Sequence, residues 1–297
     1  MNRQTLIAEI FSKKTFLCVG LDPEPERIPA HLAGHDDPVF EFNRQIIDAT
    51  RDLCVAYKPN VAFYEALGPN GWSTLHRTIE YIGKQHLVIA DAKRGDIGNT
   101  SRKYAEAFFS RMSCDAITVA PYMGEDSVSP FLAFDGKWVV LLALTSNKGS
   151  SDFQQNIQAS TGGPLWEQVM QRAQDWGTPG NLMFVVGATH PEAFARVREI
   201  APDHFLLVPG VGAQGGDLAA ICRYGLNEDC GLLVNAARSI LYASSGTDFA
   251  EKARAEARVL QREMAMRERA MVCRAPTSRC RPYSNHWLRR EKPPWPA

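Results

Sequence analysis

Eight short, almost continuously apolar segments recur along the chain, and this repetition is the feature that most constrains its fold. Strands that are apolar on both faces are typical of a parallel sheet covered by helices. Between them lie helix-favouring segments such as 38–53, 72–85 and 100–112, and a last helix is predicted over Asp248–Met271. The predicted strands are residues 16–22, 55–61, 86–93, 116–122, 138–146, 181–189, 204–212 and 231–239.

Eight such units predict the α/β class and a closed (β/α)8 TIM barrel, with an open doubly wound sheet as the alternative. The length of 297 residues is compatible with one barrel domain, which we assign to residues 1–270. Active sites of this fold lie at the carboxyl ends of the strands.

The net charge of zero is unevenly distributed. Residues 271–297 contain five prolines and carry a net charge of +5, so the preceding residues carry −5. We predict a basic, proline-rich tail that does not fold. Such a tail can bind nucleic acid or anionic surfaces, but we favour an appendage unrelated to the function of the barrel, and we expect no nucleic-acid partner.

The chain has the composition expected of a cytoplasmic protein. Its longest apolar run, Trp138–Leu144, is far too short to cross a membrane, and the first residues have no signal-peptide core. The seven cysteines contain no C-x-x-C pair, which favours reduced thiols. We therefore expect no association with membranes.

Polar residues stand at the predicted carboxyl ends of six strands, whose preceding halves are mostly apolar. Because these ends meet on one rim of a barrel, the polar residues are expected to form one site. They are Asp22, Lys58, Asp91 with Lys93, Thr145 with Ser146, Gly210 with Gly212, and Arg238.

The densest group is in residues 86–101, HLVIADAKRGDIGNTS. Alternation along a strand points Asp91 and Lys93 the same way, about 6–7 Å apart. With Lys58 on the neighbouring strand they would form a Lys–Asp–Lys row, and Asp96 follows the turn at Gly95. Such an array suits a reaction that creates negative charge at carbon and then delivers a proton to it.

Other interpretations of this group remain open. It could be an ion-pair network that only fixes the strand ends. Asp91 and Asp96 could hold Mg²⁺, although the lysines compete for the same carboxylates. Lys93 could form a Schiff base, although neighbouring carboxylates would keep it protonated. The histidines have no zinc-binding spacing, so we expect no metal site.

A second site is indicated by PGVGAQGGD (209–217) and NAARS (235–239). Glycine-rich turns after the seventh and eighth strands of a barrel typically bind phosphate through backbone N–H groups. Arg238 adds a planar group that matches two phosphate oxygens. Gly210, Gly212 and Gly215 also match the dinucleotide pattern G-x-G-x-x-G, but a phosphate monoester fits this position better.

These motifs closely resemble orotidine 5′-phosphate decarboxylase, in its larger bacterial branch. The resemblance covers about residues 10–265. It is carried by GLDP (20–23), AYKPN (56–60), DAKRGDIGNT (91–100), LTSNKGS (144–150), PGVGAQGGD (209–217) and ARSI (237–240). It implies decarboxylation of orotidine 5′-phosphate to UMP in pyrimidine biosynthesis, without metal or cofactor.

The resemblance also implies a role for each matching residue. Lys93 would protonate the carbanion at C6, Asp91 would lie beside the substrate carboxylate, and Lys58 and Asp96 would complete the charge row. Asp22 and Lys58 would contact the ribose, Ser146 the pyrimidine, and Gln214 and Arg238 the phosphate, with Gly212 and Gly215 in the phosphate-binding turn. A homodimer is implied in which Asp96 and Thr100 reach the partner's site, and residues 149–163 would form a lid.

Two further classes keep these motifs. One is a Mg²⁺-dependent decarboxylase or aldolase acting on sugar phosphates, against which Ser146 and Gln214 argue. The other is a non-catalytic protein that binds a phosphate ligand, against which the complete set of Lys58, Asp91, Lys93 and Asp96 argues. Residues 271–297 have no counterpart in the family pattern.

Overall fold

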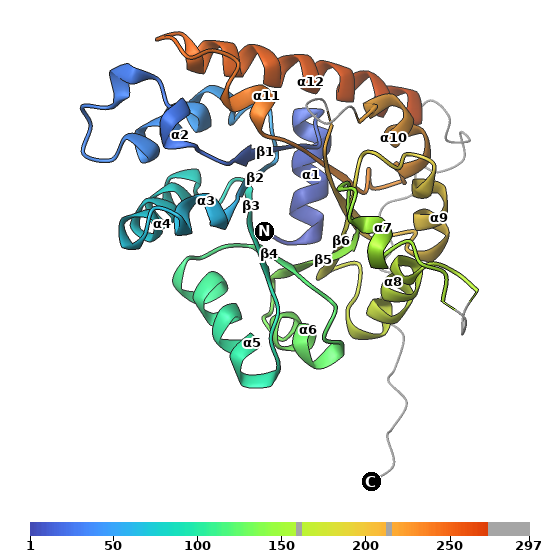
Figure 1. The fold of residues 1–297 in the computed structure, drawn as a ribbon. Coiled ribbons are helices and arrows are strands. Elements are labelled where there is room, and N and C mark those ends of the chain that lie inside the picture. Colours follow the sequence, from blue (N-terminus) through green and yellow to red (C-terminus); the bar gives the residue numbers. More distant parts are fainter. Residues whose placement is uncertain (159–161, 212–215, 273–297) are drawn as a thin grey trace.

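The computed structural model describes residues 1–158, 162–211 and 216–272. Its eight parallel strands close into a barrel in the order of the sequence, with helices around the outside (Figure 1). The predicted (β/α)8 barrel is confirmed. The strands are β1 (Leu17–Leu21), β2 (Ala56–Pro59), β3 (Leu87–Arg94), β4 (Ala116–Val119), β5 (Trp138–Leu144), β6 (Leu182–Val186), β7 (Phe205–Pro209) and β8 (Leu232–Ala236).

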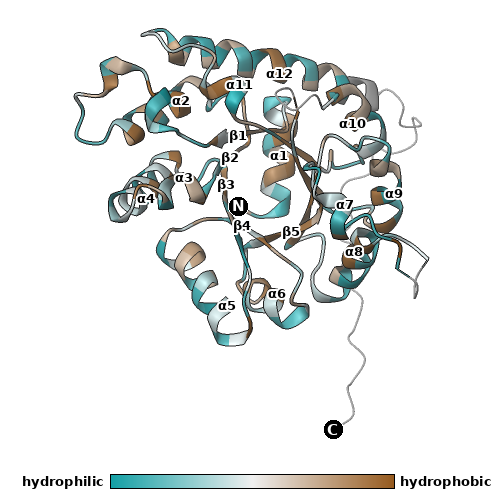
Figure 2. Cartoon of the chain, in the orientation of Figure 1, coloured by the Kyte–Doolittle hydropathy of each residue, from teal (hydrophilic) through white to brown (hydrophobic). Residues whose placement is uncertain are grey.

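The helices between the strands bury one face against the barrel. Figure 2 shows brown, hydrophobic strands in the centre and teal, hydrophilic residues along the surrounding helices. The larger helices are α1 (Arg3–Lys13), α2 (Pro38–Thr50), α4 (Pro69–Ile82), α5 (Gly98–Ala105), α6 (Glu125–Leu132), α8 (Leu165–Trp176), α9 (Ala193–Ile200), α10 (Leu218–Gly225) and α12 (Phe249–Val272). Short helices are α3 (Val61–Glu65), α7 (Ser150–Phe153) and α11 (Arg238–Leu241), and a π-helix, η3 (Glu106–Arg111), continues α5.

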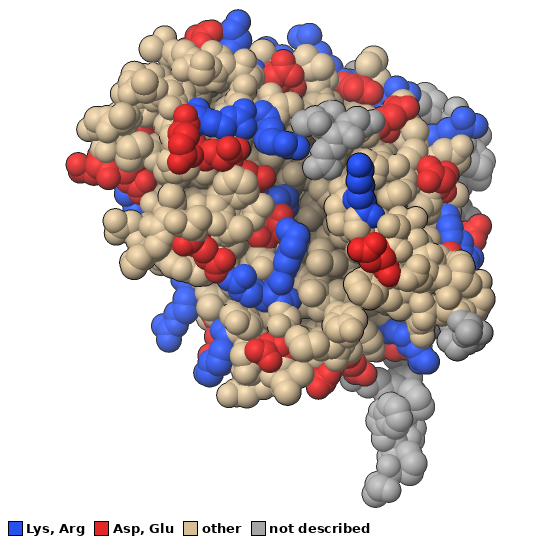
Figure 3. Space-filling view, in the orientation of Figure 1, with Lys and Arg blue, Asp and Glu red and all other residues tan. Residues whose placement is uncertain are grey.

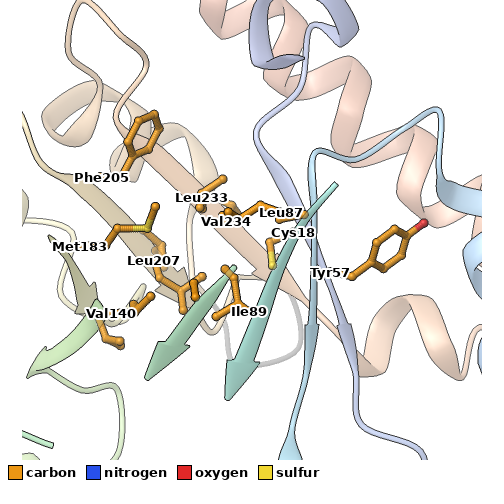
Figure 4. Packing of buried hydrophobic residues seen from close by; sticks show 14 of the residues in the cluster. Cys18, Tyr57, Leu87, Ile89, Val140, Met183, Phe205, Leu207, Leu233 and Val234 are labelled. Atoms are coloured by element: carbon orange, nitrogen blue, oxygen red, sulfur yellow. The ribbon is translucent and has the colours of Figure 1, made fainter. Parts of the chain in front are cut away.

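Apolar side chains fill the interior of the barrel. Met183, Leu207, Val140 and Ile89 lie in the space that the strands enclose, whereas Tyr57 points away from it (Figure 4). The Tyr57 hydroxyl instead reaches α2, where it donates a hydrogen bond to the backbone oxygen of Ile47 (3.1 Å). Because side chains alternate along a strand, the next residue of β2, Lys58, points into the barrel.

The amino end of the barrel is closed by the start of the chain. The α-amino group of Met1 pairs with Asp115, and the Trp138 indole donates to the backbone oxygen of Met1 (2.9 Å). The Arg3 guanidinium lies over the Phe205 ring, 5.1 Å from its centroid. Because this end is plugged, the opposite, carboxyl end is left as the place for a site.

The predicted last helix, Asp248–Met271, is observed as Phe249–Val272. It therefore includes the first two residues of the segment 271–297 that we assigned to the tail, and the remaining residues, 273–297, lie outside the described ones. Within the described ranges, no helix is long and apolar enough to cross a membrane.

Candidate active site

Lys58, Asp91 and Lys93 meet at the carboxyl end of the barrel. The Lys58 ammonium donates to Asp91 Oδ2 (2.7 Å), and the Lys93 ammonium donates to Asp91 Oδ1 (2.6 Å). The predicted Lys–Asp–Lys row is therefore present in this single chain. Figure 3 shows basic and acidic side chains together around a hollow near the centre of this face.

The two lysines differ in exposure. The side chain of Lys58 is only 5% exposed, whereas that of Lys93 is 52% exposed. Burial alone would raise the pKa of Asp91, but the charges and hydrogen bonds of Lys58 and Lys93 hold it well below its ordinary value. Burial alone would lower the pKa of Lys58, but Asp91 and Asp22 raise it above its ordinary value. The buried pair is thus kept ionised, and Lys93 presents its ammonium group to the mouth.

An irregularity in β3 brings Lys93 to Asp91. The pairing of β3 with β4 shifts register between Ala90 and Arg94, and Lys93 has a positive φ of 47°. A side chain other than glycine rarely adopts this conformation, and such strain is characteristic of functional sites. Thr118 on β4 supports it: its hydroxyl accepts a hydrogen bond from the Lys93 backbone N–H (2.9 Å) and donates to Asp91 Oδ1 (3.1 Å).

The other two charged residues of the segment 86–101, Arg94 and Asp96, lie outside the row. Arg94 turns outward, pairs with Glu65 on α3 and donates to the backbone oxygen of Ala92 (2.9 Å). Asp96 accepts a hydrogen bond from the backbone N–H of Ile97 (2.7 Å), at the start of α5. Among the described contacts, none joins Asp96 to Lys58, Asp91 or Lys93. Within its own chain, Asp96 therefore does not complete the charge row, which is the role that the family resemblance implied for it.

Asp22 follows β1 beside the row. Burial raises the pKa of its carboxyl, while Lys58, Lys93 and Arg238 act to lower it and Asp91 to raise it. Its Oδ1 atom is buried and has no hydrogen-bond partner among the described residues. A ligand that donates a hydrogen bond would satisfy this atom.

Part of the predicted phosphate-binding site lies within the described residues. Arg238 is exposed at the first position of α11, and Gly210 adopts a positive φ of 96° at the turn after β7. The turn closes tightly, because the N–H of Gly216 bonds to the backbone oxygen of Gly210 (3.2 Å). A Cβ at Gly216 would lie only 2.8 Å from that oxygen. The predicted residues Gly212, Gln214 and Gly215 lie outside the described residues.

Ser146 and Thr100 come from different elements, the loop after β5 and helix α5. Ser146 follows β5 and packs so closely on Gly187 that a Cβ there would approach the Ser146 backbone nitrogen to 2.7 Å. Thr100 is exposed on α5. The segment predicted as a lid contains α7, and Gln154 after it accepts a hydrogen bond from the Thr145 backbone N–H (2.8 Å); residues 159–161 are outside the described ones.

Sequence reasoning missed Thr118 and Asn235, which face the mouth from β4 and β8. In a parallel barrel, residues in register on adjacent strands face the same side. Thr118 is the polar residue of the strand AITV and Asn235 that of LLVNA, and a polar residue within an otherwise apolar strand was the signal that could have identified them. In the described ranges, no three His, Cys, Asp or Glu side chains come together as ligands for a metal ion.

The fold and this centre define a (β/α)8-barrel protein whose carboxyl end carries a lysine–carboxylate–lysine array. Comparison with known proteins identifies the family of this chain. The model described as the "Orotidine 5′-phosphate decarboxylase / HUMPS family" matches residues 15–253, and the chain belongs to this family.

Similar proteins extend over nearly the whole chain. Orotidine 5′-phosphate decarboxylase of Flavobacterium johnsoniae is 58% identical over 268 residues, which is 89% of this chain and 97% of that protein. The Bacteroides fragilis protein of the same name is 53% identical over 92% of this chain and all of its own length. The solved Leishmania donovani OMP decarboxylase is 38% identical with a TM-score of 0.74, covering 88% of this chain and 99% of its own. The predicted resemblance is confirmed.

Proposed function

We propose that this chain converts orotidine 5′-phosphate to UMP and CO2, and that Lys93 delivers the proton without a metal or cofactor. Membership of the family and the names of its similar proteins support the overall reaction. The observation that carries the mechanism is the half-exposed Lys93 ammonium, held 2.6 Å from an ionised Asp91 at the mouth of the barrel.

The chemistry follows from charge placement. Breaking the bond between C6 and the carboxylate releases CO2 and leaves an electron pair on C6. The Lys93 ammonium stabilises this charge and forms the new C6–H bond with one of its protons, which solvent then replaces. Because Lys93 is already fixed by Asp91 and Thr118, little reorganisation is needed as the charge develops.

The phosphate, the ribose and the pyrimidine of the substrate would be bound by other residues at the carboxyl end of the barrel. In the proposal, Arg238 with Gly212, Gln214 and Gly215 binds the phosphate, Asp22 and Lys58 contact the ribose, and Ser146 contacts the pyrimidine. Phosphate binding far from the reacting carbon can contribute to rate by holding the base against Lys93. Closure of residues 149–163 over the base belongs to the same proposal.

The proposal is tested by mixing EDTA-treated protein with orotidine 5′-phosphate and following the loss of substrate absorbance. We expect full turnover, with UMP as the product and no stimulation by added Mg²⁺. Activity that requires Mg²⁺ would instead support the related class of metal-dependent enzymes that act on sugar phosphates. Binding without turnover would indicate a ligand-binding protein.

We further propose a homodimer in which Asp96 and Thr100 complete the partner's site. Ile97, between these two residues in the sequence, is exposed, and so are Tyr122 and Met123 after the neighbouring strand β4, with Tyr122 89% exposed. Large exposed apolar side chains grouped at one place are typical of an interface. They come from the loops after β3 and β4, next to the charge row.

Mixing two inactive variants tests the shared site. If Lys93 of one subunit works with Asp96 of the other, a K93A/D96A heterodimer has one intact site and one doubly altered site. A 1:1 mixture after subunit exchange should then regain about a quarter of wild-type activity. A mixture in which heterodimers form but regain no activity would contradict the shared site.

A cytoplasmic location is part of this proposal. All five cysteines within the described residues are buried, and Cys18, Cys54, Cys114 and Cys222 are free, which supports a reducing compartment.

A further inference from the structure

Gly20 lies in the barrel mouth between the charge row and Arg238, and its surroundings are closely packed, because a Cβ at Gly20 would stand 2.6 Å from the Ala237 Cβ. In the sheet, Gly20 of β1 is in register with Lys58 of β2, and Cys18 of β1 is in register with Asn235 of β8. Residues in register face the same side, and Lys58 faces the interior. Gly20, Cys18 and Asn235 therefore all face the interior as well, and the missing side chain of Gly20 lets Ala237 and Asn235 approach β1 closely.

The Asn235 amide is the polar group that comes close to Gly20. Asn235 is only 8% exposed, and its Oδ1 atom lies 3.3 Å from the point where a Cβ on Gly20 would stand. This oxygen is buried and has no hydrogen-bond partner among the described residues. Nothing in the catalytic proposal uses it.

Asp22 gives a second, independent indication at the same place. It lies two residues after Gly20 and so continues the inward-facing row of β1, and its buried Oδ1 also lacks a described partner. Lys58, on the other side of Gly20, donates to Asp91 and to no other described residue. Buried polar atoms without hydrogen-bond partners are rare. Two such acceptors, near an ammonium group that donates only one described hydrogen bond, therefore indicate a ligand-binding site.

The chemistry of these atoms selects the ligand group. Two orphan acceptors require donors, and an ammonium proton requires an acceptor; a sugar hydroxyl is both donor and acceptor. The position also fits, because Arg238 follows Asn235 by three residues and the charge row lies on the adjacent strands β2 and β3. In a nucleotide, the sugar joins the phosphate to the base.

We infer that Asn235 is a substrate-binding residue that hydrogen-bonds a ribose hydroxyl, together with Asp22 and Lys58. The inference rests on the proposed function and deepens it, because it makes the amide of Asn235 a determinant of selectivity for ribonucleotides over deoxyribonucleotides. A site built to hydrogen-bond a hydroxyl discriminates against the analogue that lacks it, since its buried polar groups are then left unpaired.

The test combines one substitution with one missing hydroxyl. Asn235→Leu keeps the approximate volume and removes both polar atoms. The value of kcat/KM is measured for orotidine 5′-phosphate and for its 2′-deoxy and 3′-deoxy analogues, in both proteins. We expect the substitution to lower kcat/KM for the ribonucleotide roughly 10–100-fold. We also expect it to cause little further loss for one of the two analogues, so that the two changes are not additive.

Two controls make the result decisive. Asn227 lies in the turn before β8, at the amino end of the barrel, and donates to the backbone oxygen of Pro202 (2.7 Å), so Asn227→Leu should leave the ribo-to-deoxy ratio unchanged. If Asn235→Leu does not fold, Asn235→Ser serves instead, with the affinities for UMP, 2′-deoxy-UMP and 3′-deoxy-UMP measured by titration calorimetry.

Losses that multiply for both analogues would overturn the inference, because Asn235 would then act independently of either hydroxyl, for example through an enclosed water. Failure of the proposed function is a separate outcome: wild-type protein would then leave orotidine 5′-phosphate unchanged.

Discussion

Asp91 accepts hydrogen bonds from three side chains at once, those of Lys58, Lys93 and Thr118. Because two of these donors are charged, the carboxylate stays ionised even though it is largely buried. The threonine is neutral, so its contribution is positional: it connects the backbone of Lys93 to the carboxylate that holds the lysine side chain.

Thr118→Val should therefore lower kcat about 10-fold while changing KM little, since it removes hydrogen bonds of about 1 kcal/mol each that orient Lys93. Steady-state kinetics with orotidine 5′-phosphate measure this. Thr78→Val is the matched control, because Thr78 is buried on α4 and bonds only Asn43 among the described residues. Equal effects of the two substitutions would show a general loss of stability rather than a positioning role.

The Arg238 guanidinium makes no hydrogen bond or ion pair with the described residues, and it is exposed at the start of α11. Arg238→Ala should raise KM for orotidine 5′-phosphate by about 100-fold through loss of a charge-assisted, two-point contact with phosphate. Arg223→Ala, which removes an exposed arginine on α10, should leave KM as it is. An unchanged KM for Arg238→Ala would count against the phosphate role.

The sequence predicted which charged residues stand at the mouth, but not how they meet. Strict alternation places Asp91 and Lys93 about 6–7 Å apart, whereas the register shift and the positive φ of Lys93 bring their side chains into contact. Such irregularities depend on tertiary contacts, here with Thr118. Asn235 was overlooked because its role becomes visible only through its register with Cys18 and the missing side chain of Gly20.

At the scale of elements, α11 and the loop after β1 are joined by one side chain. The Tyr242 hydroxyl accepts a hydrogen bond from the Glu24 backbone N–H (2.7 Å) and donates to the backbone oxygen of Asp22 (3.0 Å). The Arg27 guanidinium covers the ring at 3.6 Å. Tyr242 directly follows the helix that begins with Arg238, so it connects the phosphate end of the site to Asp22.

Tyr242→Phe should loosen this connection while keeping the ring in place. We expect kcat/KM for orotidine 5′-phosphate to fall about 5–10-fold, mainly through KM, because two backbone groups around Asp22 lose their partner. Tyr81→Phe is the control: that hydroxyl bonds Asp48 on the outer surface (2.8 Å) and should not affect KM. If both variants behave like wild type, Tyr242 has no positioning role.

All eight strands were predictable, because apolar runs bounded by polar turns identify them, but several ends were not. The second strand was predicted to continue to Val61, yet the chain enters α3 at that residue, where the Asn60 side chain accepts a hydrogen bond from the N–H of Ala62 (3.3 Å). The segment 100–112 was predicted as one helix, but it contains the π-helix Glu106–Arg111. Helix capping and the formation of a π-helix depend on contacts with neighbouring residues, which the periodicity of apolar residues does not reveal.

At the scale of the whole molecule, the fold buries a histidine whose ring nitrogens have no hydrogen-bond partner among the described residues. His204 is 3% exposed, and both ring nitrogens are buried without hydrogen-bond partners among the described residues. Burial lowers the pKa of His204 from 6.5 to about 4. As the pH falls from about 6.5 to 4, the unfolded chain binds a proton that the folded chain does not, so stability declines over this window.

His204→Leu should reduce that decline. From the lowered pKa, the contribution lost by pH 4 is roughly 3 kcal/mol, and the substitution should remove much of this part of the pH dependence. Urea unfolding between pH 7 and pH 4 measures it. His76→Leu, at an exposed position on α4, should leave the dependence unchanged, and the same slope for His204→Leu and wild type would contradict the argument.

The central claim is that Lys93, held by Asp91 at the open end of the barrel, supplies the proton at C6. The most direct test is the rate of orotidine 5′-phosphate decarboxylation by EDTA-treated Lys93→Ala, with Lys103→Ala on α5 as the matched surface control and circular dichroism to verify folding. We predict that turnover falls by several orders of magnitude in Lys93→Ala and stays normal in Lys103→Ala. Near-normal turnover by a folded Lys93→Ala protein would contradict the account.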